Sequence, residues 1–212
     1  MRAPPDSIVM PSSWRRRRVA IIVALLAGSG ILLDRLVRQP RPGGDWERYH
    51  DQAFRVDRII DGDTLDIVAP DGQKPVTRLR LWGVDTPETK SDRGPAAHFG
   101  AEARQFAERT LEERTVHLVL SPRRTRDKYG RLLAYVYLSR GGRMFNEMLL
   151  EEGFAYADLR FDHHDFKQFQ SIEKQARRER RGLWAEVTPE QMPAWRKRFE
   201  TATEVDDNPD DP

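Results

Sequence analysis

The sequence predicts a small α+β domain, a five-stranded β-barrel of the OB type with about three helices, preceded by an N-terminal hydrophobic membrane helix. Five short segments rich in β-branched or alternating apolar residues predict the strands. Three segments with apolar residues at helical spacing predict the helices. The length of 212 residues leaves room for one domain of ordinary size with extensions.

The strands are expected in two groups along the chain. The first group comprises three segments, Phe54–Ile60, Thr64–Val68 and Val76–Trp82. Asp61-Gly62 and Asp71-Gly72 separate these segments, and Asp-Gly between apolar runs is typical of hairpin turns. The second group comprises Thr115–Leu120 and Leu132–Leu138. Five strands at short intervals suit a small barrel, although the pattern leaves open whether the sheet closes.

Three amphipathic helices accompany these strands. The first carries one apolar face, formed by Phe99, Ala103, Phe106, Ala107 and Leu111. The second covers residues 143–152 and places Phe145, Met148 and Leu149 together. The third carries Phe166, Phe169, Ile172 and Ala176, and we expect Gly182 to end it because glycine commonly terminates helices.

Composition limits the class of protein. Hydrophobic residues make up 38% of the chain and charged residues 33%, which is typical of a well-solvated globular protein and not of a polytopic membrane protein. The chain has no cysteine, which excludes a disulfide framework and any thiolate metal site. The formal net charge of +2 permits binding to a polyanion without identifying the partner.

The N-terminal region predicts a membrane anchor. Four arginines, Arg15–Arg18, precede the apolar run Val19–Leu33, which Leu36 and Val37 extend. We therefore expect a basic cytoplasmic leader over 1–18 and a single membrane span over 19–37, with the following domain outside the cytoplasm. The alternative is a signal peptide cleaved near Ala27-Gly28-Ser29, which would yield a secreted protein. The apolar run continues beyond that point, which favours the uncleaved anchor.

Composition also predicts the domain boundaries. Two prolines and two glycines predict a linker over residues 38–52, followed by the folded domain over 53–185. A short extension is expected over 186–199. The last segment, 200–212, holds six acidic residues and few apolar side chains, so we expect a disordered tail there.

Four acidic side chains lie near the ends of two predicted strands. Asp61 and Asp63 follow the first strand, and Asp85 and Glu88 follow the third. A calcium ion takes about 6 to 8 oxygen ligands, so carboxylates from separate segments can hold it together with water. Pro87 disfavours helical geometry at the residue before it, which would leave the Thr86 carbonyl free to coordinate.

Each of these patterns also has a simpler interpretation. Asp61-Gly62 alone is a hairpin turn. The segment Asp85–Glu88 alone could be the start of a helix, because proline and acidic residues are common in a first turn. The basic segment Arg126–Arg131 alone could be a solvated loop.

Arginines close to these acids favour a catalytic interpretation. Arg80 alternates with leucines in a predicted strand just before Asp85, and Arg126–Arg131 offers Lys128, Tyr129 and Arg131 around one turn. Hydrolysis of a phosphodiester needs a neutralised phosphate, a positioned water and stabilisation of added negative charge. Carboxylates with guanidinium groups opposite them match that requirement.

Four ordered motifs resemble the staphylococcal nuclease, or thermonuclease, family. They are Ile60-Asp-Gly-Asp-Thr64, Leu79-Arg-Leu-Trp-Gly-Val-Asp-Thr-Pro-Glu-Thr-Lys90, Asp127-Lys-Tyr-Gly-Arg131 and Asn146-Glu147. The likeness covers about residues 53–185 and ends at Arg181-Gly-Leu-Trp184. It implies an OB-type barrel with helices, in agreement with the strand and helix pattern.

The resemblance also implies a role for each matched residue. Asp63 and Asp85 would ligate Ca²⁺ by their carboxylates, and Thr86 by its main-chain carbonyl, with Asp61 supporting the metal site. For the remaining residues, the family implies that Arg80 and Arg131 contact the scissile phosphate, that Glu88 orients or deprotonates the attacking water, and that Lys128 and Tyr129 bind substrate phosphate. The segment after Gly153 is two residues shorter than in the family nuclease, so the base-stacking residue stays unassigned between Tyr156 and Phe161.

The function implied by the resemblance is calcium-dependent hydrolysis of DNA, RNA or both by a monomer, leaving 3′-phosphates. A site with two firm carboxylate ligands should bind Ca²⁺ weakly, at roughly 10⁻⁴ to 10⁻³ M, which suits a domain outside the cytoplasm. The alternatives are a non-catalytic nucleic-acid-binding or interaction module on the same fold, and a membrane-attached adaptor. Retention of the full set of acids and arginines favours the enzyme. The adjacent His163-His164 and the arginines of 177–181 are expected to be loop and surface residues.

Overall fold

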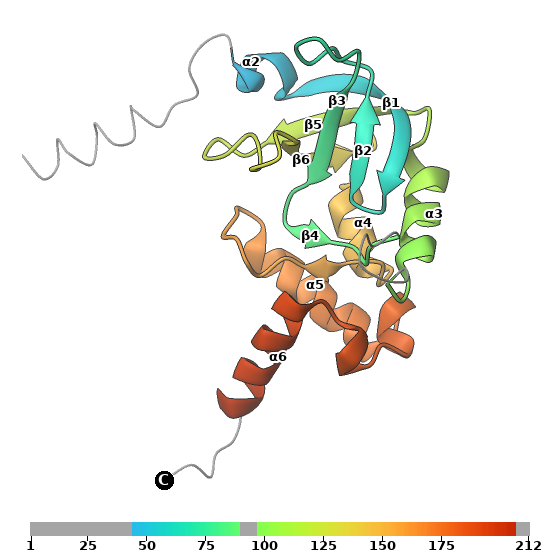
Figure 1. Ribbon diagram of the computed structural model, residues 1–212, viewed down its shortest axis with the longest axis vertical. Coiled ribbons are helices and arrows are strands. Elements are labelled where there is room, and N and C mark those ends of the chain that lie inside the picture. Colours follow the sequence, from blue (N-terminus) through green and yellow to red (C-terminus); the bar gives the residue numbers. More distant parts are fainter. Residues whose placement is uncertain (1–43, 90–96, 207–212) are drawn as a thin grey trace, which may run out of the picture. The chain divides into compact units, whose positions relative to one another are not determined.

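The computed structural model describes residues 44–89 and 97–206, which belong to one compact unit (Figure 1). The predicted leader 1–18, the predicted anchor 19–37 and the end of the acidic tail, residues 207–212, lie outside the described residues. Within the described ranges, every helix is too short or too polar to cross a membrane.

Five strands form a closed barrel in the order β1-β2-β3-β6-β5. Their bounds are Gln52–Asp61 for β1, Thr64–Ile67 for β2, Thr77–Leu81 for β3, Thr115–Leu120 for β5 and Leu132–Tyr137 for β6. Four of the five pairings are antiparallel, and β3 closes the barrel by pairing with β6 in parallel, with Leu79 opposite Leu132. The five predicted strands and the OB-type barrel are confirmed.

The three predicted helices are present, and two further helices accompany them in the described ranges. The observed α-helices are α2 (Asp45–Tyr49), α3 (Gly100–Leu111), α4 (Phe145–Glu151), α5 (Phe166–Arg178) and α6 (Ala194–Asp206). Helix α2 lies inside the stretch that the sequence predicts to be a linker. It is held there by Tyr49, which is fully buried and shares a hydrogen bond of 2.9 Å with the Thr77 hydroxyl. Helix α6 continues past residue 200, where the sequence predicts the tail to begin.

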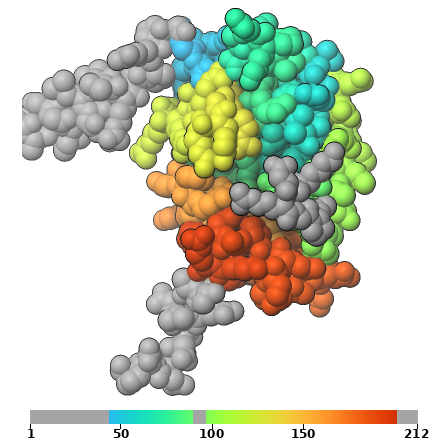
Figure 2. All heavy atoms as spheres, viewed as in Figure 1, coloured from blue at the N-terminus to red at the C-terminus, as the bar shows by residue number. Residues whose placement is uncertain are grey.

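Apolar side chains form two cores. The larger core fills the barrel and extends under α3 and α4, with Leu65, Leu79, Leu118 and Leu132 among its fully buried members. The smaller core lies beside α5 and includes Tyr156, Leu183 and Trp184. Figure 2 shows the segments that surround this second core, coloured orange to red, gathered against one end of the barrel strands.

A two-stranded sheet outside the barrel was not predicted from the sequence. Strand β4 (Val84–Asp85) pairs antiparallel with β7 (Tyr156–Ala157), and each is only two residues long. Gly83 turns the chain from β3 into β4 with a φ of 78°, and a Cβ atom there would come within 2.6 Å of the His163 ring. Glycine is therefore required at the turn that brings Asp85 to the end of the barrel.

Candidate active site

The β1–β2 hairpin places Asp63 against the end of β4. Asp61 pairs with Thr64, so Gly62 and Asp63 form a two-residue turn. A Cβ atom on Gly62 would lie 2.8 Å from Cγ2 of Thr86, and this close approach explains the glycine. The backbone N–H of Thr86 donates to Oδ2 of Asp63 at 2.7 Å, which fixes the carboxylate beside Thr86.

Arg80 joins the two aspartates that the sequence predicts to be metal ligands. Its Nη1 forms an ion pair with Oδ2 of Asp63, and its Nη2 forms an ion pair with Oδ1 of Asp85. Burial lowers the pKa of Arg80 from its ordinary value, and attraction to Asp85 opposes that shift. Two carboxylates from different segments therefore converge on one positive group.

Arg131 lies on the loop between β5 and β6 and is held by Asp127. Its backbone N–H and its Nε donate to the Asp127 carboxylate at 3.0 and 2.6 Å. The guanidinium lies 5.5 Å from the ring centroid of Tyr129, and the Lys128 ammonium lies 4.9 Å from the same centroid. Tyr129 is 72% exposed, so the loop presents an aromatic ring and two cations to solvent at the edge of the cleft.

One cleft of about 650 Å³ collects nearly all of the predicted site residues. Its lining includes Asp61, Asp63, Arg80, Asp85, Glu88, Lys128, Tyr129 and Arg131. Thr86 lines an adjoining pocket of about 390 Å³, to which Asp85 and Glu88 also contribute. The structure thus brings together residues from four separate parts of the chain.

Glu88 has the ionisation behaviour of a base that works near neutral pH. Its pKa is raised to about 7, first by loss of hydration, then by a hydrogen bond with Asp61 and by repulsion from Asp61 and Asp85. Asp61 is itself oriented by the Gly62 N–H, which donates to its Oδ1 at 3.0 Å. A carboxylate with such a pKa can accept a proton efficiently at neutral pH.

The oxygen donors around Asp63 fit a hard cation. The structure, over residues 44–89 and 97–206, holds no group of three or more acidic or histidine side chains arranged to bind a metal. The donors available are the carboxylates of Asp63 and Asp85 together with Thr86, whose buried Oγ1 has no hydrogen-bond partner within those ranges. Hard divalent cations such as Ca²⁺ favour carboxylate and carbonyl oxygens and complete their shell with water, so this set is chemically suitable.

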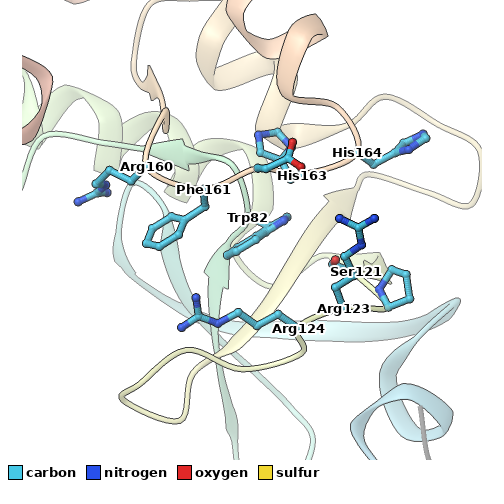
Figure 3. A pocket seen from close by; sticks show the side chains of 10 residues that line it. Trp82, Ser121, Arg123, Arg124, Arg160, Phe161, His163 and His164 are labelled. Atoms are coloured by element: carbon cyan, nitrogen blue, oxygen red, sulfur yellow. The ribbon is translucent and has the colours of Figure 1, made fainter. Parts of the chain in front are cut away.

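An aromatic pocket adjoins the cleft, and the two candidate stacking residues differ in their exposure to solvent. Tyr156 is 2% exposed and lies in the core, whereas Phe161 is 41% exposed. Phe161 stacks on Trp82 with ring centroids 5.8 Å apart, and Arg124 and Arg160 lie near its ring (Figure 3). These residues line a pocket of about 690 Å³. Of the two candidates, Phe161 alone offers an accessible ring face.

Sequence reasoning missed two residues that contact Asp85. Arg160 Nη2 lies 3.2 Å from Oδ1 of Asp85, and Trp195 Nε1 donates to Oδ2 of Asp85 at 2.8 Å. Arg160 falls in the segment after Gly153, where the family motifs are weakest. Trp195 lies in the C-terminal extension, and a tryptophan in a polar stretch is the one signal that could have drawn attention to it.

Comparison with known proteins decides the family. Residues 78–186 match the family described as staphylococcal nuclease homologue. The chain belongs to the staphylococcal nuclease family. This family match includes Arg80, Asp85, Glu88 and Arg131, and it ends before Trp195.

Individual relatives of this staphylococcal nuclease homologue carry nuclease names. The chain is 39% identical over 137 residues to a thermonuclease of Staphylococcus hyicus, covering 64% of this chain and 78% of that protein. It is 38% identical over 134 residues to a thermonuclease of Staphylococcus intermedius, covering 63% and 76%. It is 34% identical over 132 residues to endonuclease YncB of Bacillus subtilis, covering 61% and 60%.

Proposed function

We propose that this protein is a calcium-dependent nuclease that hydrolyses phosphodiester bonds of DNA, RNA or both and leaves 3′-phosphates. The observation that carries the proposal is the convergence of Asp63 and Asp85 on Arg80, in a cleft that also holds Glu88 and Arg131. The nuclease names of its relatives, two thermonucleases and an endonuclease, support the same activity.

The side chains of the cleft have different roles in the proposed reaction. Arg80 and Arg131 donate N–H groups to the phosphate oxygens and stabilise the negative charge that builds up on them. Glu88 accepts the proton of the attacking water at its carboxylate, which its raised pKa favours. The water oxygen bonds to phosphorus, the bond from phosphorus to the 5′ oxygen breaks, and that oxygen takes a proton from solvent and leaves as a 5′-hydroxyl. Bound Ca²⁺, held by Asp63, Asp85 and the Thr86 carbonyl, would supply Lewis-acid polarisation of the phosphate.

The rim of the cleft positions the polymer. Lys128 and Tyr129 project from the exposed loop and contact neighbouring phosphate groups. Phe161 stacks on an unpaired base, since every base offers a π-face to an aromatic ring. Arg124 and Arg160 beside that ring attract the backbone of the same nucleotide.

The test incubates the purified full chain with supercoiled plasmid and with single-stranded RNA, in calcium chloride or in EGTA. We expect cutting only with calcium, and product 5′ ends that a kinase labels without prior phosphatase treatment. The Glu88→Gln variant serves as the inactive control. A chain that retards the plasmid without cutting it would be a binding module, and a chain that does neither would refute the nuclease proposal.

We propose further that residues 19–37 anchor the protein in a membrane with the nuclease domain outside the cytoplasm. The four arginines before the apolar run support this orientation. Sedimentation of the expressed chain with membranes, followed by protease treatment of intact cells or spheroplasts, tests it. A soluble product shortened at its N-terminus would instead support secretion after cleavage.

A further inference from the structure

Trp195 reaches the candidate active site from a segment that the family match does not include. It lies in the first turn of α6, whereas the match ends at residue 186. Its indole Nε1 donates a hydrogen bond of 2.8 Å to Oδ2 of Asp85. The other oxygen of that carboxylate, Oδ1, faces Arg80 and Arg160. The indole therefore holds one oxygen of Asp85, while the two arginines contact the other.

The indole ring is held in this orientation by its neighbours. The Arg160 guanidinium lies 4.5 Å from the Trp195 ring centroid, and Tyr156 packs against the ring edge-on at 6.4 Å. Arg160 is fixed in turn by Asp158, whose Oδ1 lies 2.7 Å from its Nε. A rotation of the indole away from Asp85 would break the contact with Arg160 as well as the hydrogen bond.

The next residue along α6 ties the helix to the strand pair that carries Asp85. Arg196 forms a buried ion pair with Glu173 of α5, and the two residues are 5% and 4% exposed. Glu173 also accepts a hydrogen bond of 2.6 Å from the backbone N–H of Ala157. Ala157 belongs to β7 and pairs with Val84, the residue just before Asp85. The helix that carries Trp195 and the strand that carries Asp85 are therefore connected through contacts with α5 and β7.

We propose that Trp195 is a positioning residue that orients the Asp85 carboxylate for metal binding. This inference rests on the proposed function, since it assigns Trp195 to the same calcium site. An indole N–H is a donor only and cannot ligate a cation, so Trp195 acts through Asp85. Hydrogen bonds to ligating carboxylates hold them in the geometry that the metal needs, and their loss typically costs about 10- to 100-fold in metal affinity or activity.

A matched control exists in the same chain. Trp184 also has an arginine, Arg177, at 4.5 Å from its ring centroid and packs edge-on against Tyr156 at 5.3 Å. Its Nε1 is buried and has no hydrogen-bond partner in the described part of the chain. Trp195→Phe and Trp184→Phe therefore make the same chemical change in similar surroundings, and only the first removes a hydrogen bond to Asp85.

The decisive measurement is calcium affinity, determined by equilibrium dialysis with radioactive calcium on the full chain. We expect Trp195→Phe to bind Ca²⁺ about 10-fold more weakly than wild type, and Trp184→Phe to bind it like wild type. Urea unfolding in EGTA shows whether each variant is folded. Equal calcium affinity in wild type and folded Trp195→Phe would overturn the inference, and so would absence of calcium binding by the wild-type chain.

The calcium dependence of cutting supplies a second readout. In Trp195→Phe the calcium concentration for half-maximal cutting should rise about 10-fold, while the rate at saturating calcium stays near wild type. A lower rate at saturation with an unchanged midpoint would indicate a structural role and overturn the inference. If the wild-type chain binds calcium but cuts no nucleic acid, the proposed function fails, and the affinity difference between the two variants still decides the role of Trp195.

Discussion

Both arginines of the cleft are oriented by aspartates before any substrate arrives. Arg80 lies between Asp63 and Asp85, and Asp127 engages the Nε side of Arg131. These contacts restrict the rotamers of two long side chains, so less conformational entropy is lost when a phosphate binds. A planar fork can also contact two phosphate oxygens at once, which a lysine cannot do.

Replacement of either arginine by lysine should therefore reduce cutting strongly although the charge is kept. We expect Arg80→Lys and Arg131→Lys each to lower kcat by about 10²- to 10³-fold, in line with the loss of one donor to transition-state charge. Steady-state kinetics on an oligonucleotide measures the effect. Arg143→Lys is the matched control, because Arg143 pairs with Glu151 and does not line the cleft. Near wild-type rates for both cleft variants would rule out bidentate contact between these arginines and the phosphate.

The raised pKa of Glu88 predicts how pH affects the stability of the metal-free protein. The pKa is about 7 in the folded chain against an ordinary value of 4.5, so the folded state binds more protons between these values. The contribution of Glu88 to stability is fully present below pH 4.5 and is lost as the pH rises to about 7. Urea unfolding in EGTA across this range should show a steeper fall for wild type than for Glu88→Gln. Parallel curves for the two proteins would contradict the shift.

Phe161 should contribute to binding and little to the chemical step. Loss of base stacking costs about 1–3 kcal/mol per base, so Phe161→Ala should raise KM for single-stranded substrate by about 5- to 150-fold and leave kcat nearly unchanged. Phe161→Tyr keeps the ring face and should behave like wild type. A fall in kcat with an unchanged KM would place Phe161 in another role.

Short strand β4 depends on elements that come much later in the chain. It pairs with β7, and β7 is fixed to α5 through the hydrogen bond from Ala157 N–H to Glu173. Arg196 of α6 covers the same glutamate and contacts the Ala157 carbonyl at 3.4 Å. The position of Asp85 at the end of β4 is therefore a product of β7, α5 and α6 together.

Disruption of the buried Arg196–Glu173 pair should destabilise the fold. Arg196→Met leaves the Glu173 carboxylate buried without its cation, and such a loss typically costs about 3–5 kcal/mol. The double variant Arg196→Met/Glu173→Gln should recover part of that loss because no unpaired charge remains. Urea unfolding measures both. Arg143→Met breaks an exposed ion pair and should change stability by less than about 1 kcal/mol.

The candidate active site lies at one end of the barrel. Hairpin β1–β2, the end of β4 and the loop before β6 meet at that end, so the barrel core determines the spacing of all the site segments. The parallel pairing of β3 with β6 closes the barrel and joins the strand of Arg80 to the loop of Arg131. The two guanidinium groups are therefore related through adjacent strands, although they are far apart in sequence.

Truncation in the barrel core should lower the stability of the entire domain. Leu79 is fully buried on β3, and Leu79→Ala should reduce the free energy of unfolding by about 2–5 kcal/mol. Val68→Ala is the control, because Val68 is 43% exposed and a surface change should stay within about 0.5 kcal/mol. A single cooperative urea transition that shifts for Leu79→Ala and not for Val68→Ala is the expected result.

Local pattern was sufficient to predict the barrel strands and three helices. Each barrel strand begins and ends within two residues of its predicted bounds, because short runs of β-branched and apolar residues bounded by turn residues are a property of neighbouring residues. Helices α3, α4 and α5 also match their predicted apolar faces, which recur at helical spacing. The expectation that Gly182 ends the third helix is wrong, because α5 ends at Arg178 and Gly182 begins a separate 3₁₀ helix over Gly182–Ala185. The motifs around Asp63, Arg80, Asp85 and Arg131 identified the candidate site for the same reason, since each is a short continuous segment.

The sequence alone thus determined the element types, the family resemblance and the identity of the candidate site residues. Only the tertiary structure decided the β4–β7 pairing, the choice of Phe161 over Tyr156 as the accessible ring, and the contacts of Arg160 and Trp195 with Asp85. The raised pKa of Glu88 belongs with these, because it arises from burial and from Asp61, which lies at the end of β1. All of these features depend on contacts between residues that are distant in the chain and come together only in the folded domain. No local sequence pattern predicts such contacts.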